Sequence, residues 1–218
     1  MSARDLPPLV RLGAACTWRS WRWVPPSLVL VASLLVIYTV QSGKAIAAYA
    51  LAMTLMVPVT AWLVAAAGNA DDGAHQRLLA AASTRPLLHA SRAAVGLLLA
   101  LPLIVAATAY PWALGFVTAP PGAFGSLRTL LLGLAAHLVG ACCGVAVGTF
   151  THRPLLVRTG GAVVVRAAGT MAAVFALLPL LRALAHDRPG ALAVAVPAAA
   201  AVALVAVAAA GRLSSRAA

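Results

Sequence analysis

Acidic residues are almost absent from this sequence. The chain of 218 residues contains four of them, Asp5, Asp71, Asp72 and Asp187, and no glutamate. Without glutamate the H-E-x-x-H motif of zinc proteases is impossible, and no G-x-S-x-G sequence is present that could form a serine nucleophile elbow. All four aspartates fall in expected loops or tails. This argues against an ion-coupled secondary transporter, because such proteins normally place carboxylates inside the membrane.

Cysteine is also scarce, with residues at positions 16, 142 and 143. Cys142 and Cys143 lie inside an apolar stretch, where cysteine behaves as a small hydrophobic residue, so no disulfide framework is indicated. His137 precedes them by five and six residues, a spacing that does not place the three side chains on one helix face. No metal site is therefore expected.

A phosphate-binding loop for nucleotides is missing as well. The only similar sequence, Ser42–Lys44, lacks the upstream glycine of the G-x-x-x-x-G-K motif. The chain is therefore not expected to be an enzyme or to hold a cofactor of its own. Any ATP hydrolysis would occur in another polypeptide.

Apolar residues dominate what is present. Hydrophobic residues make up 63% of the chain and charged residues 9%, with a mean hydropathy of +0.98, whereas soluble domains have roughly 25% charged residues. We expect an all-α integral membrane protein. The net charge of +12 does not indicate nucleic-acid binding, because the arginines lie between apolar runs. A single lysine and abundant alanine are typical of a GC-rich bacterial genome, so the expected location is the bacterial cytoplasmic membrane.

The apolar runs predict six transmembrane helices, since a helix needs about 20 apolar residues to cross the hydrocarbon layer. The six predicted spans are Trp23–Val40, Ala45–Ala67, Ala93–Trp112, Thr129–Phe150, Gly161–Leu181 and Ala191–Ala210. They form one membrane domain, 23–211, between an N-terminal segment, 1–22, and a short tail, 212–218.

The first span has two possible interpretations. Basic residues precede its short apolar run and small polar residues follow it, which is also typical of a signal peptide. The sequence before it, RLGAACTWRSWRWVPP, interleaves three arginines with three tryptophans. That pattern indicates an amphipathic segment at the level of the lipid headgroups, or an ordinary aromatic and basic flank.

The arginines predict an orientation. If both termini are cytoplasmic, twelve basic residues lie inside: Arg4, Arg11, Arg19, Arg22, Arg77, Arg85, Arg92, Arg153, Arg158, Arg166, Arg212 and Arg216. Four lie outside: Lys44, Arg128, Arg182 and Arg188. This asymmetry follows the positive-inside rule and requires an even number of spans.

The longest polar interruption, DDGAHQRLLAAASTRPLLHASR, lies in the predicted cytoplasmic loop 68–92. Asp71 and Asp72 are suited to cap a short helix that contains Arg77, Leu78 and Leu79, with the leucines facing the base of the membrane domain. The STRP turn then ends this helix, and a second helix begins near Pro86. The alternative is a solvated loop with incidental helix.

This loop resembles the coupling helix of permease subunits in ATP-binding-cassette transporters of the type 2, exporter-like class. The resemblance includes six spans, cytoplasmic termini and an elbow helix, and its local residues are Asp71, Asp72, Arg77, Leu78, Leu79, Ser83, Thr84, Arg85, Pro86 and Arg92. The chain departs from the family by lacking the Gly-Thr-Leu-Glu run, since Gly73 is followed by Ala74 and His75.

The resemblance implies that Asp71, Asp72, Arg77, Leu78, Leu79, Arg85 and Pro86 couple the chain to a separate ATPase subunit, which binds ATP and magnesium. It also implies a second permease subunit, in a homodimer or heterodimer, and export. The substrate stays open among drug, lipid, peptide and glycan. A non-transporting membrane scaffold or immunity-type protein is the alternative.

Two features inside the spans complete the sequence-based expectations. Gly140, Gly144 and Gly148 recur every four residues and predict close helix packing, either within the subunit or between subunits. His137 is an ionisable residue deep in the fourth predicted span. Either it forms a hydrogen bond to a neighbouring helix or it belongs to a substrate or proton site.

Overall fold

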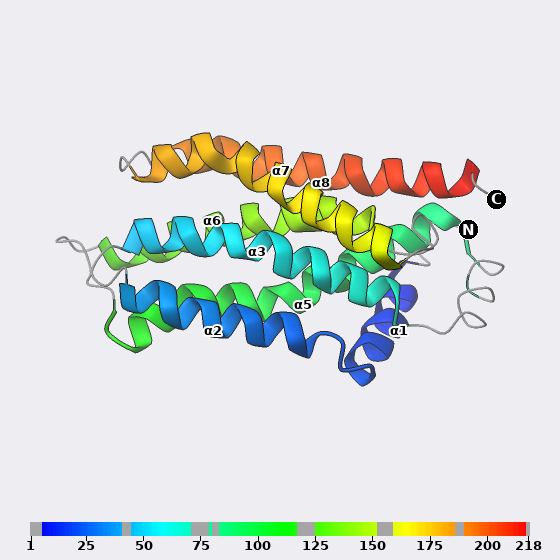
Figure 1. Cartoon of the computed structure of the whole chain (residues 1–218), viewed down its shortest axis with the longest axis horizontal. Helices are drawn as coiled ribbons and strands as arrows, with labels where there is room; N and C mark the ends of the chain where they lie inside the picture. The colour runs from blue at the N-terminus through cyan, green and yellow to red at the C-terminus, as the bar shows by residue number, and fades with distance from the viewer. Residues whose placement is uncertain are drawn as a thin grey trace.

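The computed structural model describes residues 6–40, 45–70, 79, 83–116, 125–151, 159–185 and 190–216. Within these residues the fold is entirely helical and contains no strand, which confirms the expected fold class at that level. The helices are α1 (Leu6–Arg19), α2 (Val24–Val40), α3 (Ala45–Gly68), α5 (Arg85–Ala113), α6 (Gly125–Thr149), α7 (Thr159–Ala185) and α8 (Ala191–Arg216) (Figure 1).

Five of these helices, α3, α5, α6, α7 and α8, are long and apolar enough to cross a membrane. Helix α2 has only 17 residues, and it meets α1 at a bend of 74°. If this bent pair is counted as one span, the described residues contain up to six. The chain is thus compatible with a multi-pass membrane protein.

Several helices extend beyond the apolar runs that predict them. Helix α5 begins at Arg85, close to the start expected near Pro86, and continues without a break into the span predicted from Ala93. Helix α8 continues to Arg216, into the range expected as a tail. Polar residues at these ends do not break a helix, because backbone hydrogen bonds continue where water or headgroups surround the side chains.

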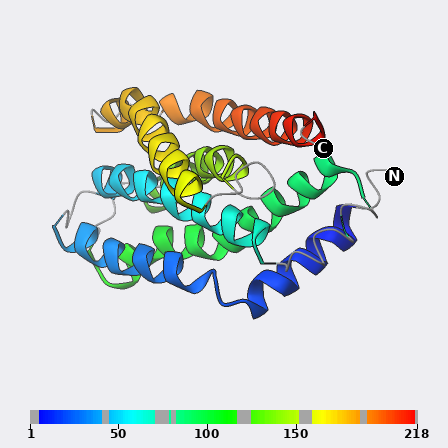
Figure 2. The ribbon, with the colours of Figure 1, turned by 45° about the vertical axis from the view of Figure 1, so that its right-hand side comes forward.

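From α2 onward, successive helices run in opposite directions along the long axis of the molecule (Figure 1). One end therefore collects α1, the starts of α2, α5 and α7, and the last residues of α3, α6 and α8. We call it the α1 end, and the opposite one the far end. Helix α7 lies obliquely across the others (Figure 2).

Helix α3 is the centre of the bundle and packs against α2, α5, α6 and α7. Small residues permit this packing. An added Cβ at Gly96 of α5 would lie 2.8 Å from the Cα atom of Val64 in α3, so the two backbones touch.

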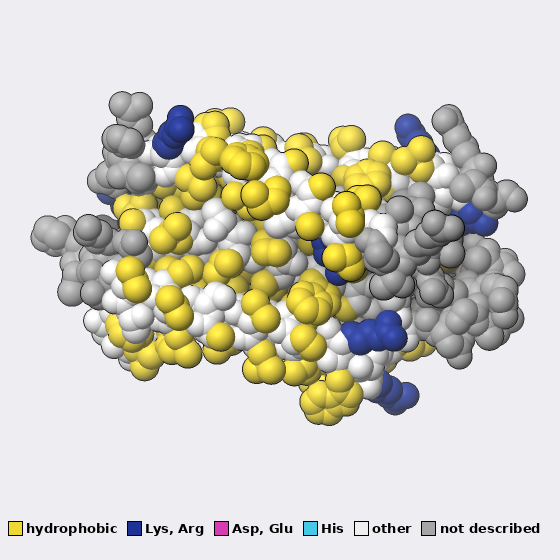
Figure 3. All heavy atoms as spheres, viewed as in Figure 1, with side chains coloured by type: hydrophobic (Ala, Val, Ile, Leu, Met, Phe, Trp, Pro, Cys, Tyr) yellow, Lys and Arg dark blue, Asp and Glu magenta, His cyan; other side chains and the backbone are white. Residues whose placement is uncertain are grey.

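Apolar side chains also cover the outside of the bundle. Exposed examples include Val36, Phe175, Val194 and Leu204. The visible face carries a broad apolar band, with most of its basic side chains towards the ends and one nearer the middle (Figure 3). Such an exterior suits hydrocarbon rather than water.

Candidate functional site

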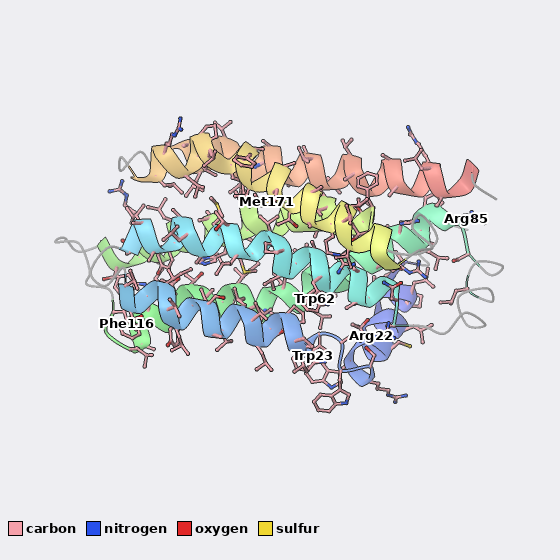
Figure 4. All side chains as sticks on the ribbon, viewed as in Figure 1. Arg22, Trp23, Trp62, Arg85, Phe116 and Met171 are labelled. Carbon is pink, nitrogen blue, oxygen red and sulfur yellow. The ribbon has the colours of Figure 1, made fainter. Side chains whose placement is uncertain are left out.

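The corner between α1 and α2 is fixed by aromatic and basic residues. Trp21 has a φ of 57°, in the left-handed region, and turns the chain between the helices. The rings of Trp18 and Trp23 stack with their centroids 4.5 Å apart. The Arg22 guanidinium donates a hydrogen bond to the Asn69 carbonyl just beyond α3 (Figure 4). Helix α1 is thereby tied to the end of α3.

Leu79 lies at the α1 end and lines a small cavity of about 20 Å³. Leu9 and Leu12 of α1 and Leu88 and Val95 of α5 line the same cavity. We call these four residues the basal seat. Leu79, which is partly exposed, therefore shares a cavity with residues of α1 and α5.

The turn after Leu79 is fixed by local hydrogen bonds. The Ser83 amide and hydroxyl both donate to the Leu79 carbonyl, at 2.9 and 2.8 Å. Thr84 is the N-cap residue of α5, with extended backbone angles, and Pro86 lies in the first turn. Proline is favoured there because the first amides of a helix have no acceptor within it. The helix restarts where the STRP sequence predicts.

Arg85 and Pro86 join the start of α5 to the end of α8. The Arg85 guanidinium donates a hydrogen bond to the Ser214 carbonyl in the last turns of α8, where helix carbonyls lack helical donors. An added Cβ at Gly211 would lie 2.8 Å from the Cα atom of Pro86. Both residues therefore have a packing role within the chain.

The predicted coupling residues are only partly described. Asp71, Asp72, Arg77 and Leu78 lie outside the described residues. Leu79, Arg85 and Pro86 all lie at the α1 end, as the topology of the loop requires. They contact different partners: Leu79 faces the basal seat, and the other two face α8.

The glycine stripe of α6 faces α3 of the same chain. An added Cβ at Gly144 would lie 2.6 Å from the Val57 carbonyl oxygen, and one at Gly148 would lie 2.8 Å from that of Ala61. An added Cβ at Gly140 would lie closer still to the Met53 carbonyl oxygen. The structure thus places the stripe in a contact within the subunit.

A polar cluster, of which the sequence singled out only His137, lies between α2, α3, α5 and α6, towards the far end. We call Tyr38, Tyr49, Thr108, Trp112 and His137 the far-end cluster. The Tyr49 hydroxyl donates to the Thr108 carbonyl at 3.0 Å and accepts from the Trp112 Nε1–H at 2.6 Å. The Tyr38 and Tyr49 rings meet edge to face, 6.3 Å apart. These contacts join α2, α3 and α5.

Pro111 explains why the Tyr38 hydroxyl forms a hydrogen bond to α5. Proline has no amide hydrogen, so Pro111 cannot donate to the carbonyl of Ala107, four residues earlier in α5. The Tyr38 hydroxyl, fully buried, donates to that carbonyl at 2.8 Å. Helix α2 therefore supplies the donor that α5 lacks, as membrane helices with internal proline require.

His137, the member of this cluster from α6, is fully buried. Its Nδ1 lies 2.6 Å from the Gly133 carbonyl and 3.3 Å from the Thr108 hydroxyl. Because a carbonyl only accepts, Nδ1 carries the hydrogen and Nε2 is the unprotonated nitrogen. Within the described residues Nε2 has no partner. The contact with Thr108 joins α6 to α5, one of the two roles expected for this residue.

The described ranges show no group of three or more histidine, cysteine, aspartate or glutamate side chains that could hold a metal ion. Arg166 of α7 is half-buried, and its Nε lies 3.4 Å from the Thr151 hydroxyl oxygen just beyond α6. It therefore reaches towards the α1 end rather than the middle of the bundle.

Comparison of the chain with protein-family models, with curated proteins and with solved structures finds no match.

Proposed function

We propose that this chain is the membrane-spanning permease subunit of an ATP-binding-cassette exporter. It acts with a second permease subunit and with a separate ATPase subunit that binds ATP and magnesium. The chain itself supplies no catalytic residue. Its task is to turn movement at the α1 end into opening and closing of a path between subunits.

The observation that carries this proposal is the position of Leu79 against the basal seat. Helix α3 ends and helix α5 begins at the α1 end, and Leu79, between them in the sequence, lines a cavity with residues of α1 and α5. A force applied to the connection between α3 and α5 by a docked partner would pass directly into two helices. Arg85 then links the same region to α8.

The distribution of arginines supports a cytoplasmic location of the α1 end. Among the described side chains, this end carries Arg11, Arg19, Arg22, Arg85, Arg92, Arg166 and Arg212, and the far end carries Arg128 and Arg182. An excess of arginine marks the cytoplasmic side. ATP is available on that side.

We assign different roles to the two faces of the helix expected around Arg77, Leu78 and Leu79. Leu79 anchors the segment to the bundle, so the opposite face would meet the ATPase. In a helix, Arg77 lies about 160° around the axis from Leu79. Arg77 is therefore the position from which a partner should be reached.

A photo-crosslinking experiment in native membranes tests this arrangement. The photoreactive amino acid p-benzoylphenylalanine replaces Arg77, and in a control chain it replaces Val205, which is exposed on α8. We expect position 77, but not position 205, to crosslink to an ATPase that contains a phosphate loop, identified by peptide mass spectrometry. Crosslinks only to membrane proteins without that motif would favour the scaffold alternative and overturn the proposal.

A pair of aspartate substitutions refines the test. Leu79→Asp removes the apolar side chain that shares a cavity with the basal seat and should reduce crosslinking from position 77 severalfold. Leu213→Asp is the matched control, because Leu213 is an exposed leucine of α8 near the same end. Equal yields in the two variants would contradict the anchoring role of Leu79.

A further inference from the structure

An open apolar groove lies between α6 and α8 at the far end, with a volume of about 590 Å³. Leu127 and Leu131 of α6 form one wall, and Val196 and Pro197 of α8 form the other. Both leucines are more than half exposed, at 55% and 56%. In a membrane this surface is in contact with lipid unless a partner covers it.

The groove has a well-packed floor. Leu132 and Val196, which line it, also pack against a buried cluster that includes Leu177, Leu180 and Leu184. Alanines at positions 135 and 193 leave the space open. The groove therefore arises from small side chains above a packed floor, and it is already formed in the absence of a ligand.

One charged residue, Arg128, lines this otherwise apolar groove. It lies in the first turn of α6 and is exposed to solvent. At the end of a spanning helix, an arginine reaches the level of the lipid phosphates. From Arg128 to Ala135 the groove extends about 10 Å along the helix axis, towards the membrane interior.

We propose that this groove binds a bilayer phospholipid with an anionic headgroup. Its phosphate meets the Arg128 guanidinium, and the upper part of one acyl chain fills the apolar hollow. Arginine is suited to this contact, since its planar group donates several hydrogen bonds to one phosphate.

Charge favours this ligand over a second copy of the chain. Each copy carries a net charge of +12 and only four acidic residues, so a docked copy would have few carboxylates to place against Arg128. An anionic lipid supplies the missing negative charge. This inference does not depend on the transport function, because it concerns the lipid-facing surface at the opposite end from the basal seat.

Native mass spectrometry of the delipidated protein in detergent micelles tests the proposal. The protein is titrated with phosphatidylglycerol, which is anionic, and with phosphatidylcholine of the same acyl chains. Arg128→Gln should weaken retention of phosphatidylglycerol about fivefold and change that of phosphatidylcholine much less. Arg182→Gln is the matched control, because Arg182 is exposed on α7 at the same end but does not line the groove.

A second set of variants tests the lipid site by filling the groove. Ala193→Trp and Leu131→Trp add bulk from the two walls, and each is used only if its circular dichroism equals that of wild type. Both should weaken retention of both lipids, since the acyl site is occupied. Equal losses in the two arginine variants, unchanged binding in the tryptophan variants, or a dimer that dissociates in Arg128→Gln would each overturn the proposal.

Discussion

Removing the Tyr38 hydroxyl should destabilise the protein through a single hydrogen bond. In Tyr38→Phe the Ala107 carbonyl loses its donor from α2, and Pro111 supplies none. Tyr38 and Ala107 are fully buried, so water does not replace the lost hydroxyl. Hydrogen bonds between membrane helices contribute about 0.6 kcal/mol on average and up to about 1.7. We expect a loss near 1 kcal/mol, because the orphaned carbonyl is enclosed.

The free energy of unfolding can be measured by titrating the purified protein in mixed micelles with sodium dodecyl sulfate and following its circular dichroism. Tyr110→Phe is the matched control. It removes a hydroxyl from the neighbouring ring, 6.0 Å from Tyr38, and within the described residues that hydroxyl has no hydrogen-bond partner. Its removal should leave the unfolding free energy unchanged or slightly increased.

A double-mutant cycle tests the role assigned to Pro111. Pro111→Ala restores an amide hydrogen that can donate to the Ala107 carbonyl. In that background Tyr38→Phe should cost less than half of what it costs in wild type. Equal costs in both backgrounds would refute the reasoning, because the tyrosine would then stabilise the protein by packing and not by replacing a missing donor.

Three further predictions concern other parts of the fold. Gly144→Ala should lower the unfolding free energy by about 1–3 kcal/mol, because its Cβ would lie 2.6 Å from the Val57 carbonyl oxygen. Gly161→Ala should not, because no atom of the described residues would lie within 4 Å of its Cβ; the same titration compares them. Arg85→Ala should speed amide hydrogen exchange in the last turn of α8, since the Ser214 carbonyl loses its donor, and unchanged exchange would count against that contact. Reporter fusions after Ser83 and after Thr118 should report opposite sides of the membrane, and the same side for both would exclude the proposed topology.

The helical framework could be predicted from the sequence, because long apolar runs leave few alternatives to membrane-spanning helices. The STRP sequence also indicated where α5 begins, but the end of α8 could not be predicted. Arg212 to Arg216 are polar enough to resemble a tail, yet they continue the helix. An apolar run shows how much of a helix lies in the hydrocarbon layer, whereas backbone hydrogen bonding determines where the helix ends.

The residues of the candidate site were predicted unevenly. The spacing of Gly140, Gly144 and Gly148 indicated a close contact, but only the structure identifies α3 as the partner. Of the far-end cluster only His137 was singled out, because Tyr38 and Tyr49 resemble ordinary apolar helix residues. Pro111 was a further signal, since it implies an orphaned carbonyl. Its donor belongs to a helix about 70 residues away, which no local pattern reveals.

The proposal that this chain works with an ATPase is tested most directly by co-purification. The tagged protein is extracted from its native membrane in mild detergent after crosslinking, and quantitative mass spectrometry measures the proteins that accompany it. We expect an ATPase with a phosphate loop in a fixed ratio to this chain, and its loss when Leu78 and Leu79 are both replaced by aspartate. If no such ATPase accompanies the wild-type chain, the chain is not a permease of this class.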